Sequence, residues 1–254
     1  MIWEHTCSLE WLQARQRFLT ATDVKDLLPY TKTGRKRTVT DDDRIKVLAR
    51  KYHEITAGDC RSSGAAARGH LLEPFAIELL NKALQENLYH WDDIVITRKT
   101  WSNMDLAFSP DAMSISPNDL PIWGSMLHGL DGYPDITIAE VKSYNPERHY
   151  SAGYSKKVEL EERWQIAVAM AVLPEIKNAY LVFYNPSMDR QMFVFEYTRN
   201  DLEDEISTVL DIETSWNWFV NQKRYTEAGV VRGEKTEAEI VEEIAARAQL
   251  NPPM

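Results

Sequence analysis

Two short segments of the sequence carry the residue types that phosphodiester hydrolysis requires. Asp111 ends a Ser-Pro-Asp triplet in one predicted strand, and the next predicted strand contains Glu140, Val141 and Lys142 in succession. Successive side chains of a strand point to opposite faces, so Glu140 and Lys142 share a face while Val141 points into the core. Hairpin pairing of the two strands would bring Asp111 beside Glu140. Two converging carboxylates form a site for a hard cation such as Mg²⁺ or Mn²⁺, which prefer oxygen ligands.

Lys142 adds a cationic group that can orient an attacking water or help to deprotonate it. Metal-assisted hydrolysis needs such a group beside cations that activate the nucleophile and stabilise charge on the attacked and leaving oxygens. A Glu-x-Lys strand is also typical of a solvent-exposed sheet face, and the segment between Asp111 and Glu140 is long for a plain hairpin. On spacing alone, a nuclease site and a surface ladder both stay open.

Two further candidates lie on predicted helices. Glu73 interrupts the apolar pattern of a helix over 65–85, and a carboxylate is costly to bury unless it is paired or bound to a metal. By pattern alone, the favoured interpretation of Glu73 is an exposed residue on the far face of that helix. Gln165 lies beside the apolar stripe of a helix over 155–173. It is either a helix-surface residue or, if that helix packs over the sheet, a contact to a substrate phosphate or to water.

The chain is acidic, with a formal net charge of −10, but its basic residues are unevenly distributed. Residues 1–70 are the only third of the chain with an excess of Lys and Arg. Four of these basic residues cluster around one glycine: Lys32, Arg35, Lys36 and Arg37. A local basic face can bind a polyanion even on an acidic protein. A solvated loop is the competing interpretation of this cluster.

Hydrophobic periodicity predicts a run of helices, then strands, then a helix, two strands and a helix. The expected helices cover residues 9–19, 21–28, 41–56, 65–85, 155–173, 200–224 and 234–249, and the expected strands cover 93–99, 104–113, 136–144, 179–184 and 192–197. This order is typical of an α/β (α+β) fold with a mixed sheet flanked by helices. We expect a single domain over residues 1–225, with an insertion at about 113–135, followed by an acidic helical extension over 226–254.

Composition excludes several other classes of protein. The 44% hydrophobic and 27% charged residues are ordinary values for a globular chain, which excludes wholesale disorder. The longest apolar runs, such as 166–173, are far shorter than a membrane-spanning helix. Two cysteines, Cys7 and Cys60, are too few for a disulfide framework, an all-cysteine zinc site or a four-cysteine iron–sulfur cluster. We therefore expect a cytoplasmic protein that has no iron–sulfur cluster and no membrane partner.

Five segments in a fixed order make the sequence similar to one nuclease family. They are Trp11 with Arg15 and Thr20-Ala21-Thr22, Arg68-Gly69 followed by Glu73, Ala107-Phe108-Ser109-Pro110-Asp111, Glu140-Val141-Lys142, and Gln165 with the strand after it. With these segments the sequence resembles the lambda-exonuclease-type, or YqaJ-like viral recombinase, nucleases of the PD-(D/E)xK superfamily. The resemblance implies a restriction-endonuclease-like core. The chain departs from the family pattern in the 113–135 insertion and in Thr22, which replaces the commoner serine.

The resemblance also implies roles for individual residues. The expected catalytic set is Glu73, Asp111, Glu140, Lys142 and Gln165. Asp111 and Glu140 are the expected metal ligands, helped by the Val141 carbonyl and by Glu73, either directly or through water. Lys142 is the expected catalytic lysine, and the glutamine is the residue that the family motif places beside it.

Arg15 and Thr22 match the pair that binds the 5′-phosphate end in such exonucleases. An arginine fork with a hydroxyl at a helix N-terminus is a good phosphate pocket. The implied activity is Mg²⁺-dependent 5′→3′ exonuclease action on linear double-stranded DNA, with Mn²⁺ as a substitute, producing 3′ single-stranded overhangs. The implied partners are DNA ends, a phage-type single-strand annealing protein, and further copies of the chain in a ring, with a trimer favoured. The implied setting is a bacterial host that carries the phage or prophage.

Two alternatives use the same residues differently. A PD-(D/E)xK endonuclease of restriction or repair type would share the core, but it has no DNA end to recognise, and Arg15 with Thr22 argues for end recognition. A non-catalytic DNA-end-binding module would keep only the fold, whereas all five expected catalytic residues are present in this chain.

Overall fold

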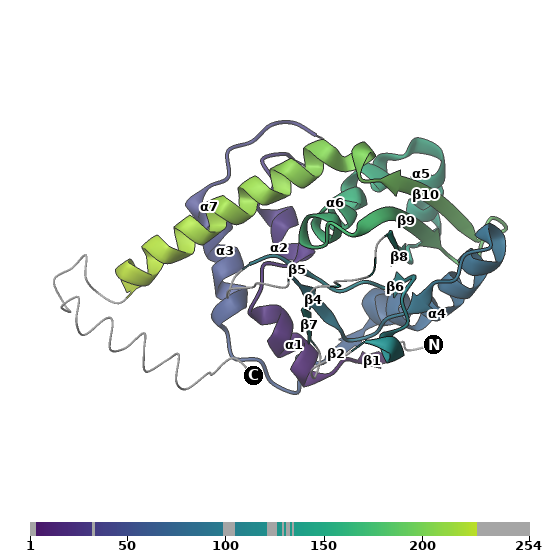
Figure 1. Cartoon of the computed structure of the whole chain (residues 1–254), viewed down its shortest axis with the longest axis horizontal. Helices are drawn as coiled ribbons and strands as arrows, with labels where there is room; N and C mark the ends of the chain where they lie inside the picture. The colour runs from purple at the N-terminus through teal and green to yellow at the C-terminus, as the bar shows by residue number, and fades with distance from the viewer. Residues whose placement is uncertain are drawn as a thin grey trace. The chain divides into compact units, whose positions relative to one another are not determined.

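The computed structural model describes residues 4–31, 34–98, 105–120, 126–128, 130, 133 and 135–227 of the chain. Its helices (Figure 1) are α1 (Leu9–Gln16), α2 (Ala21–Asp26), α3 (Asp41–Tyr52), α4 (Gly64–Leu84), α5 (Pro146–Ser155), α6 (Lys157–Val172) and α7 (Glu203–Glu227), with short 3₁₀ helices η1 (Pro117–Asp119) and η2 (Asn200–Leu202). Its strands are β1 (Glu4–Thr6), β2 (Arg61–Ser63), β3 (Tyr89–His90), β4 (Val95–Thr97), β5 (Ala107–Phe108), β6 (Ala112–Met113), β7 (Met126–His128), β8 (Ile136–Lys142), β9 (Ile176–Tyr184) and β10 (Met192–Thr198).

The chain divides into two compact units, residues 1–212 and residues 213–254. The described part of the second unit is the C-terminal portion of α7. The acidic helix predicted over 234–249 lies outside the described residues, and the domain boundary predicted at residue 225 stays a prediction. Within the described residues, no helix combines the length and the apolar character that crossing a membrane requires.

The main sheet has five strands in the order β10-β9-β8-β6-β3. Strand β8 lies at its centre, parallel to β9 and antiparallel to β6, so the expected mixed sheet is confirmed. A second sheet of three strands has the order β5-β4-β7. Its strand β7 belongs to the 113–135 insertion, for which the sequence predicts no strand, and it pairs in parallel with β4. This pairing joins the insertion to the body of the first unit.

The register of β6 on β8 brings the two chemistry-bearing segments together. Ala112 in β6 pairs with Ala139 in β8. Asp111 directly precedes β6 and Glu140 directly follows Ala139, so antiparallel pairing places the two carboxylates at the same end of this strand pair. The neighbourhood predicted for Asp111 and Glu140 is therefore confirmed.

The structure also corrects the elements predicted just before and just after β8. The strand predicted over 104–113 is two short strands, β5 and β6, separated by a segment that contains Pro110, which has no N–H to donate to a strand ladder. The helix predicted over 155–173 is preceded by a further helix, α5, whose N-cap Asn145 accepts a hydrogen bond from the backbone of the first turn. Lys156 then adopts a left-handed conformation, with φ of 56°, and this turn separates α5 from α6.

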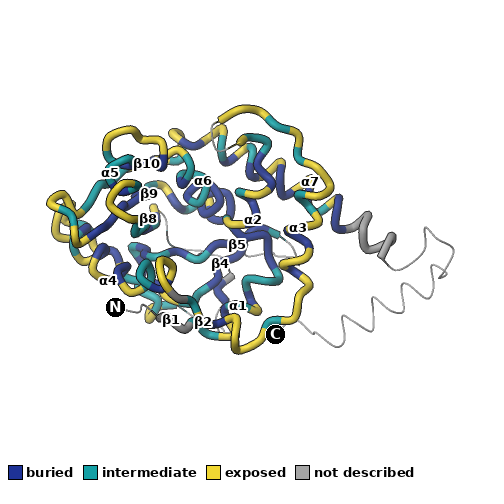
Figure 2. The backbone as a smooth tube through the Cα atoms, turned by 180° about the vertical axis from the view of Figure 1, so that it is seen from behind, coloured by how far each residue is buried: buried dark blue, intermediate teal, exposed yellow. Residues whose placement is uncertain are grey.

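Helix α4 covers one face of the main sheet. Its apolar residues pack in one core cluster with residues of β8 and β9, among them Leu72, Ala76, Ile77, Leu80, Ala139, Val141 and Val182. Val141 is thus a core residue, as the alternation of β8 predicts. Helix α6 packs against β9 and β5, and Figure 2 shows it buried along much of its length. The opposite face of β8 carries the buried Ile136 and Ile138 and then, towards the end of the strand, the polar Glu140 and Lys142.

Helix α2 has six residues, and a buried ion pair joins it to α3. The Asp23 carboxylate lies 2.5 Å from Nζ of Lys51 in α3, and the two side chains are 4% and 5% exposed. The N–H and the hydroxyl of Thr20 donate to the same carboxylate, at 2.9 and 2.7 Å. Burial alone would raise the pKa of Asp23, but Lys51 and Thr20 outweigh it and the pKa is lowered, so the carboxylate stays ionised.

We expect Lys51→Met to lower the free energy of unfolding by about 3 kcal/mol, because the buried Asp23 carboxylate then keeps only the partly exposed Arg50 as an ion-pair partner among the described residues. Urea unfolding followed by circular dichroism measures this loss. The double variant Asp23→Asn/Lys51→Met should recover much of this loss, because it removes both charges of the buried pair. If the losses of the two single variants simply add in the double variant, Asp23 and Lys51 do not stabilise each other as an ion pair.

Candidate active site

A cavity of about 210 Å³ lies at the end of β8 that carries Glu140. Its described lining comes from α1, α2, α4, α6, β4, β5, β8 and the segment around Asp111. The lining includes all the predicted catalytic and metal-ligating residues and the predicted phosphate pair: Arg15, Thr22, Glu73, Asp111, Glu140, Val141, Lys142 and Gln165. Residues from separate parts of the sequence are therefore gathered in one place.

The backbone of β8 holds Asp111 in place. Oδ2 of Asp111 accepts a hydrogen bond from the N–H of Val141 at 2.6 Å. Burial, followed by the charges of Glu140 and Glu73, raises the pKa of Asp111 well above its ordinary value of 3.8. Lys142 and the hydrogen bond from β8 oppose this shift without cancelling it. Three carboxylates thus share a poorly solvated site that is short of positive charge.

Glu140 and Lys142 project from one face of β8 into the cavity, as strand alternation predicts. Nζ of Lys142 lies 2.5 Å from Oε1 of Glu140, and Nε2 of Gln165 donates to the same oxygen at 2.7 Å. Within the described part of the chain, Oε2 of Glu140 receives no hydrogen bond. Burial alone would lower the pKa of Lys142, but the carboxylates of Glu140, Asp111 and Glu162 outweigh it and raise that pKa, so Lys142 is a cation.

Glu73 is buried, which corrects the exposed position that its sequence pattern favours. Nδ1 of His70 and Nε2 of His90 lie 3.2 and 3.8 Å from its carboxylate. Burial alone would raise the pKa of Glu73, but the two histidines outweigh it and lower the pKa to about 2. The histidines therefore make the burial of an ionised carboxylate tolerable.

Arg15 belongs to the lining of the cavity. Its guanidinium carbon lies 4.4 Å from the ring centroid of Trp11, and Nε1 of Trp11 donates to the Ser109 hydroxyl at 3.2 Å. Among the residues that the structure describes, the guanidinium has no hydrogen-bond acceptor. Thr22 adds a hydroxyl to the same lining. A cation with free donors beside a hydroxyl suits an anion such as a terminal phosphate.

The predicted basic cluster lies outside the described lining of this cavity. Arg35 and Lys36 are exposed, and Lys32 lies outside the described residues. Arg37 forms an ion pair with Asp43 at 2.7 Å. Arg37 therefore anchors the loop to α3, whereas Arg35 and Lys36 remain available to a polyanion.

The donor set at the end of β8 fits a hard divalent cation. No group of three or more His, Cys, Asp or Glu side chains in the described ranges has the geometry of a complete metal cage. Mg²⁺ does not need one, because it is usually held by one or two carboxylates and keeps several waters. Asp111 and Glu140 supply that pair: both line the cavity, and Oε2 of Glu140 receives no hydrogen bond within the described part of the chain. The Val141 carbonyl and Glu73 are further oxygen donors in the lining.

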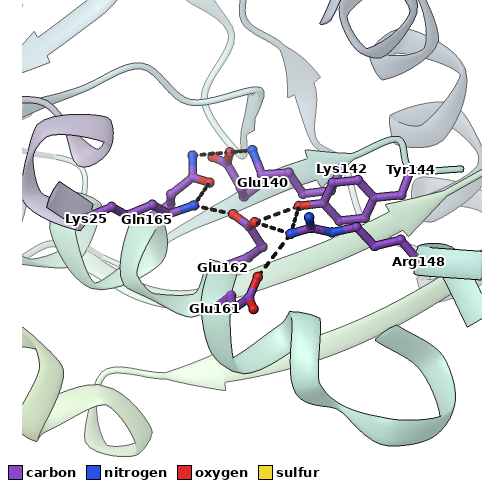
Figure 3. A network of polar contacts seen from close by, with 8 residues as sticks. All are labelled: Lys25, Glu140, Lys142, Tyr144, Arg148, Glu161, Glu162 and Gln165. Atoms are coloured by element: carbon purple, nitrogen blue, oxygen red, sulfur yellow. Dashed lines mark hydrogen bonds and ion pairs between the residues drawn. The ribbon is translucent and has the colours of Figure 1, made fainter. Parts of the chain in front are cut away.

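Four residues beside this set escaped prediction from the sequence. Figure 3 shows them in one polar network with Glu140, Lys142 and Gln165: Lys25, Tyr144, Arg148 and Glu162. Lys25, Arg148 and Glu162 are charged residues on helices and look like surface residues, so their types carry no signal. Two hints are available: Tyr144 lies two positions after Lys142 in the strand predicted over 136–144, and Glu162 precedes Gln165 by three positions and therefore shares its helix face.

Comparison with known proteins finds no match among family models or among curated proteins. Solved structures do match. The chain is similar to an alkaline exonuclease (LHK-Exo) from Laribacter hongkongensis, with a TM-score of 0.55 and 20% identity over 85% of this chain and 98% of that one. The complex of LHK-Exo with dAMP gives a TM-score of 0.54 at the same identity and coverage. A phage-related exonuclease from Haemophilus somnus 129PT gives a TM-score of 0.48 at 11% identity, over 80% of this chain and 95% of that one.

At 20% identity the likeness to LHK-Exo is a likeness of fold. It extends over nearly the whole of the solved exonuclease and most of this chain. The fold implied by the sequence resemblance is therefore confirmed, and this chain has the fold of an alkaline exonuclease.

Proposed function

We propose that the protein is a Mg²⁺-dependent exonuclease that degrades linear double-stranded DNA from the 5′ end and leaves 3′ single-stranded overhangs. One observation carries the proposal. Asp111, Glu140 and Lys142 meet in one cavity at the same end of the paired strands β6 and β8, on the fold of an alkaline exonuclease. The proposal also assigns Mn²⁺ as a substitute for Mg²⁺.

In this proposal Asp111 and Glu140 hold the cation, with the Val141 carbonyl and Glu73 as further oxygen donors. When bound, the cation would activate the nucleophile and stabilise negative charge on the attacked and leaving oxygens. Oε1 of Glu140 is already engaged by two donors, so Oε2 is the oxygen left to face it. The cost of burying neighbouring carboxylates is then offset by the positive charge that the site lacks.

Lys142 is protonated in the described structure because carboxylates surround it. We assign to it the orientation of the attacking water and the stabilisation of charge on the phosphate, for which its N–H groups are donors. Gln165 holds the Glu140 carboxylate from the opposite side to Lys142. Lys142 and Gln165 together fix the orientation of the Glu140 carboxylate before substrate binds.

The 5′ polarity of the proposal depends on Arg15 and Thr22. Both line the same cavity as Asp111 and Glu140, so a terminal phosphate held by Arg15 would place the first phosphodiester near the carboxylates. LHK-Exo has been solved with dAMP, a mononucleotide. We propose that the cavity of this chain accepts the same class of product.

Linear duplex DNA labelled at either the 5′ or the 3′ end tests the polarity. Under the proposal, a 5′ label is released at once as a mononucleotide in Mg²⁺, whereas a 3′ label stays on a long single strand. Early release of the 3′ label would reverse the polarity.

We expect Arg15→Gln to remove the preference for 5′-phosphorylated ends. Loss of charge-assisted hydrogen bonds should slow digestion of 5′-phosphorylated duplex by about 10- to 100-fold and leave 5′-hydroxyl duplex nearly unaffected. Arg17→Gln is the matched control, because Arg17 lies on the same segment but outside the described cavity lining. Equal slowing of both substrates would make Arg15 a general backbone contact or a structural residue.

The proposal extends to the assembly and setting that the sequence resemblance implies. We propose a ring of identical subunits, with a trimer favoured, that acts on DNA ends in the bacterial cytoplasm with a single-strand annealing protein. Exposed Arg35 and Lys36 are candidate contacts to the DNA backbone. The molar mass in solution, measured by light scattering, tests the trimer.

A further inference from the structure

Lys25 joins the catalytic residues to a buried carboxylate on α6. Its ammonium donates to Oε1 of Gln165 at 3.1 Å and forms a short ion pair with Glu162. Gln165 in turn donates to Glu140 at 2.7 Å. Figure 3 shows the resulting chain of contacts from Lys25 through Gln165 to Glu140 and Lys142.

The contact from Lys25 fixes which way the Gln165 amide faces. An ammonium group can only donate hydrogen bonds, so it selects the carbonyl oxygen of the amide. The amide nitrogen is then directed at Glu140, whose carboxylate can only accept. Lys25 and Glu140 therefore select the same orientation of the amide from its two ends, and without Lys25 the carbonyl oxygen of Gln165 would lose the donor that holds it.

Glu162 holds Lys25 in this position. Its side chain is 8% exposed and also accepts a hydrogen bond from the Tyr144 hydroxyl at 2.6 Å, with Arg148 at 3.5 Å. Burial alone would raise the pKa of Glu162, but Lys25 and Lys142 outweigh it and lower the pKa, so Glu162 is ionised. A buried ionised carboxylate with three partners is a fixed anchor, in contrast to a mobile surface ion pair.

Lys25 does not act from inside the catalytic cavity. The described lining of that cavity includes Gln165 and Thr22 but not Lys25. Lys25 instead lines a neighbouring groove of about 730 Å³, together with Lys157 and Trp164. Its path to the reacting groups therefore runs through the Gln165 amide.

We propose that Lys25 and Glu162 are positioning residues, which set the Gln165 amide and through it the direction of the Glu140 carboxylate. The expected effect on kcat rests on the proposed nuclease function. The contacts of Lys25 and Glu162 with Gln165 and Glu140 do not depend on that function. Removal of a group that orients a metal ligand without itself binding the metal typically lowers activity by about 10- to 100-fold.

Kinetics of Lys25→Met on 5′-phosphorylated linear duplex test the inference. We expect kcat to fall by about 10- to 100-fold, with KM for DNA ends changed by less than about twofold. Lys25→Arg should recover much of kcat, because guanidinium also only donates. Lys157→Met is the matched control, since Lys157 lines the same groove and its ammonium has no hydrogen bond or ion pair among the described residues. A raised KM, shared with the control, would make Lys25 an attractor of DNA and overturn the inference.

A double-mutant cycle separates action through Gln165 from direct action. In a Gln165→Met background, Lys25→Met should lower kcat by less than about twofold, because the group through which it acts is gone. Equal losses in both backgrounds would overturn the inference. Glu162→Gln should resemble Lys25→Met, because the ammonium then loses its charged anchor.

A readout without DNA separates this inference from the proposed function. The pair of NMR signals from the side-chain amide of Gln165 is identified in the ¹⁵N spectrum of the wild type as the pair that is missing in Gln165→Met. We expect that pair to shift in Lys25→Met and to stay in place in Lys157→Met, while thermal melting confirms that both variants fold. An unchanged pair overturns the inference even if the protein is a nuclease, and a shifted pair supports it even if no DNA is cut.

Discussion

Replacing Lys142 by Met should lower the rate of DNA hydrolysis by about three orders of magnitude. The side chain is close to isosteric, so the change removes the ammonium that lies 2.5 Å from Glu140 and leaves the shape of the cavity almost unchanged. Both assigned tasks of Lys142, orienting the water and stabilising charge on the phosphate, then have no donor. Single-turnover digestion of end-labelled duplex at saturating Mg²⁺ measures the loss of the chemical step directly.

Lys82→Met is the control for Lys142→Met, because Lys82 is exposed on α4 and pairs with Glu78 one turn away. It should digest DNA at the wild-type rate. Circular dichroism should show both variants folded. Turnover of Lys142→Met within tenfold of wild type would remove this lysine from the mechanism.

Asp111→Asn should abolish hydrolysis and at the same time stabilise the metal-free protein. In the wild type, burial and the charges of Glu140 and Glu73 raise the pKa of Asp111. The folded state therefore binds a proton more tightly than the unfolded state, and stability falls as pH rises from the ordinary pKa of 3.8 towards the raised one. Asparagine does not titrate, and its amide oxygen can still accept from the N–H of Val141. The variant avoids this loss of stability.

Thermal melting in EDTA and in Mg²⁺ checks the Asp111 prediction. In EDTA at pH 7 the variant should melt about 2–4 °C above wild type, and the gap should narrow as pH is lowered towards 4. Mg²⁺ should raise the melting temperature of the wild type, because a ligand of the folded state stabilises it, and should have little effect on the variant. A variant that melts lower than wild type in EDTA would contradict the charge imbalance inferred for this site.

The part of the site on strands was predictable because its geometry is local. Alternation along β8 places Glu140 and Lys142 on one face and Val141 on the other, whatever the rest of the fold. Pairing of β6 with β8 adds Asp111, and the apolar alternation of both segments is visible in the sequence. The strand-borne part of the candidate site therefore follows from two strands and one register.

The part of the site that depends on distant partners was not predictable. The sequence pattern around Glu73 favours an exposed residue. The structure buries its carboxylate beside His70, one turn away, and His90 of β3, which only the fold brings close. Lys25 and Glu162 are 137 positions apart, and each reads by itself as a charged residue of a helix surface. Their meeting requires the packing of α2 against α6, which no local periodicity encodes.

The strand within the 113–135 insertion was not predictable for the same reason, because it depends on a distant partner. Its Pro- and Gly-rich composition predicts a long connection, but Met126–His128 forms β7 on β4. A parallel pair joins strands that are not neighbours in the chain, so its pairing depends on the partner strand rather than on the turn residues between them. Short strands of this kind leave little trace in a hydrophobic pattern.

The most direct test of the central claim is digestion of linear and covalently closed circular duplex DNA of one sequence, side by side, in Mg²⁺ and in EDTA. Glu140→Gln serves as the control for contaminating nucleases. We expect mononucleotides from the linear DNA in Mg²⁺ only, intact circles in both buffers, and no release by Glu140→Gln. Nicking or cutting of the circles, or no Mg²⁺-dependent release from linear ends, would contradict an exonuclease built on Asp111, Glu140 and Lys142.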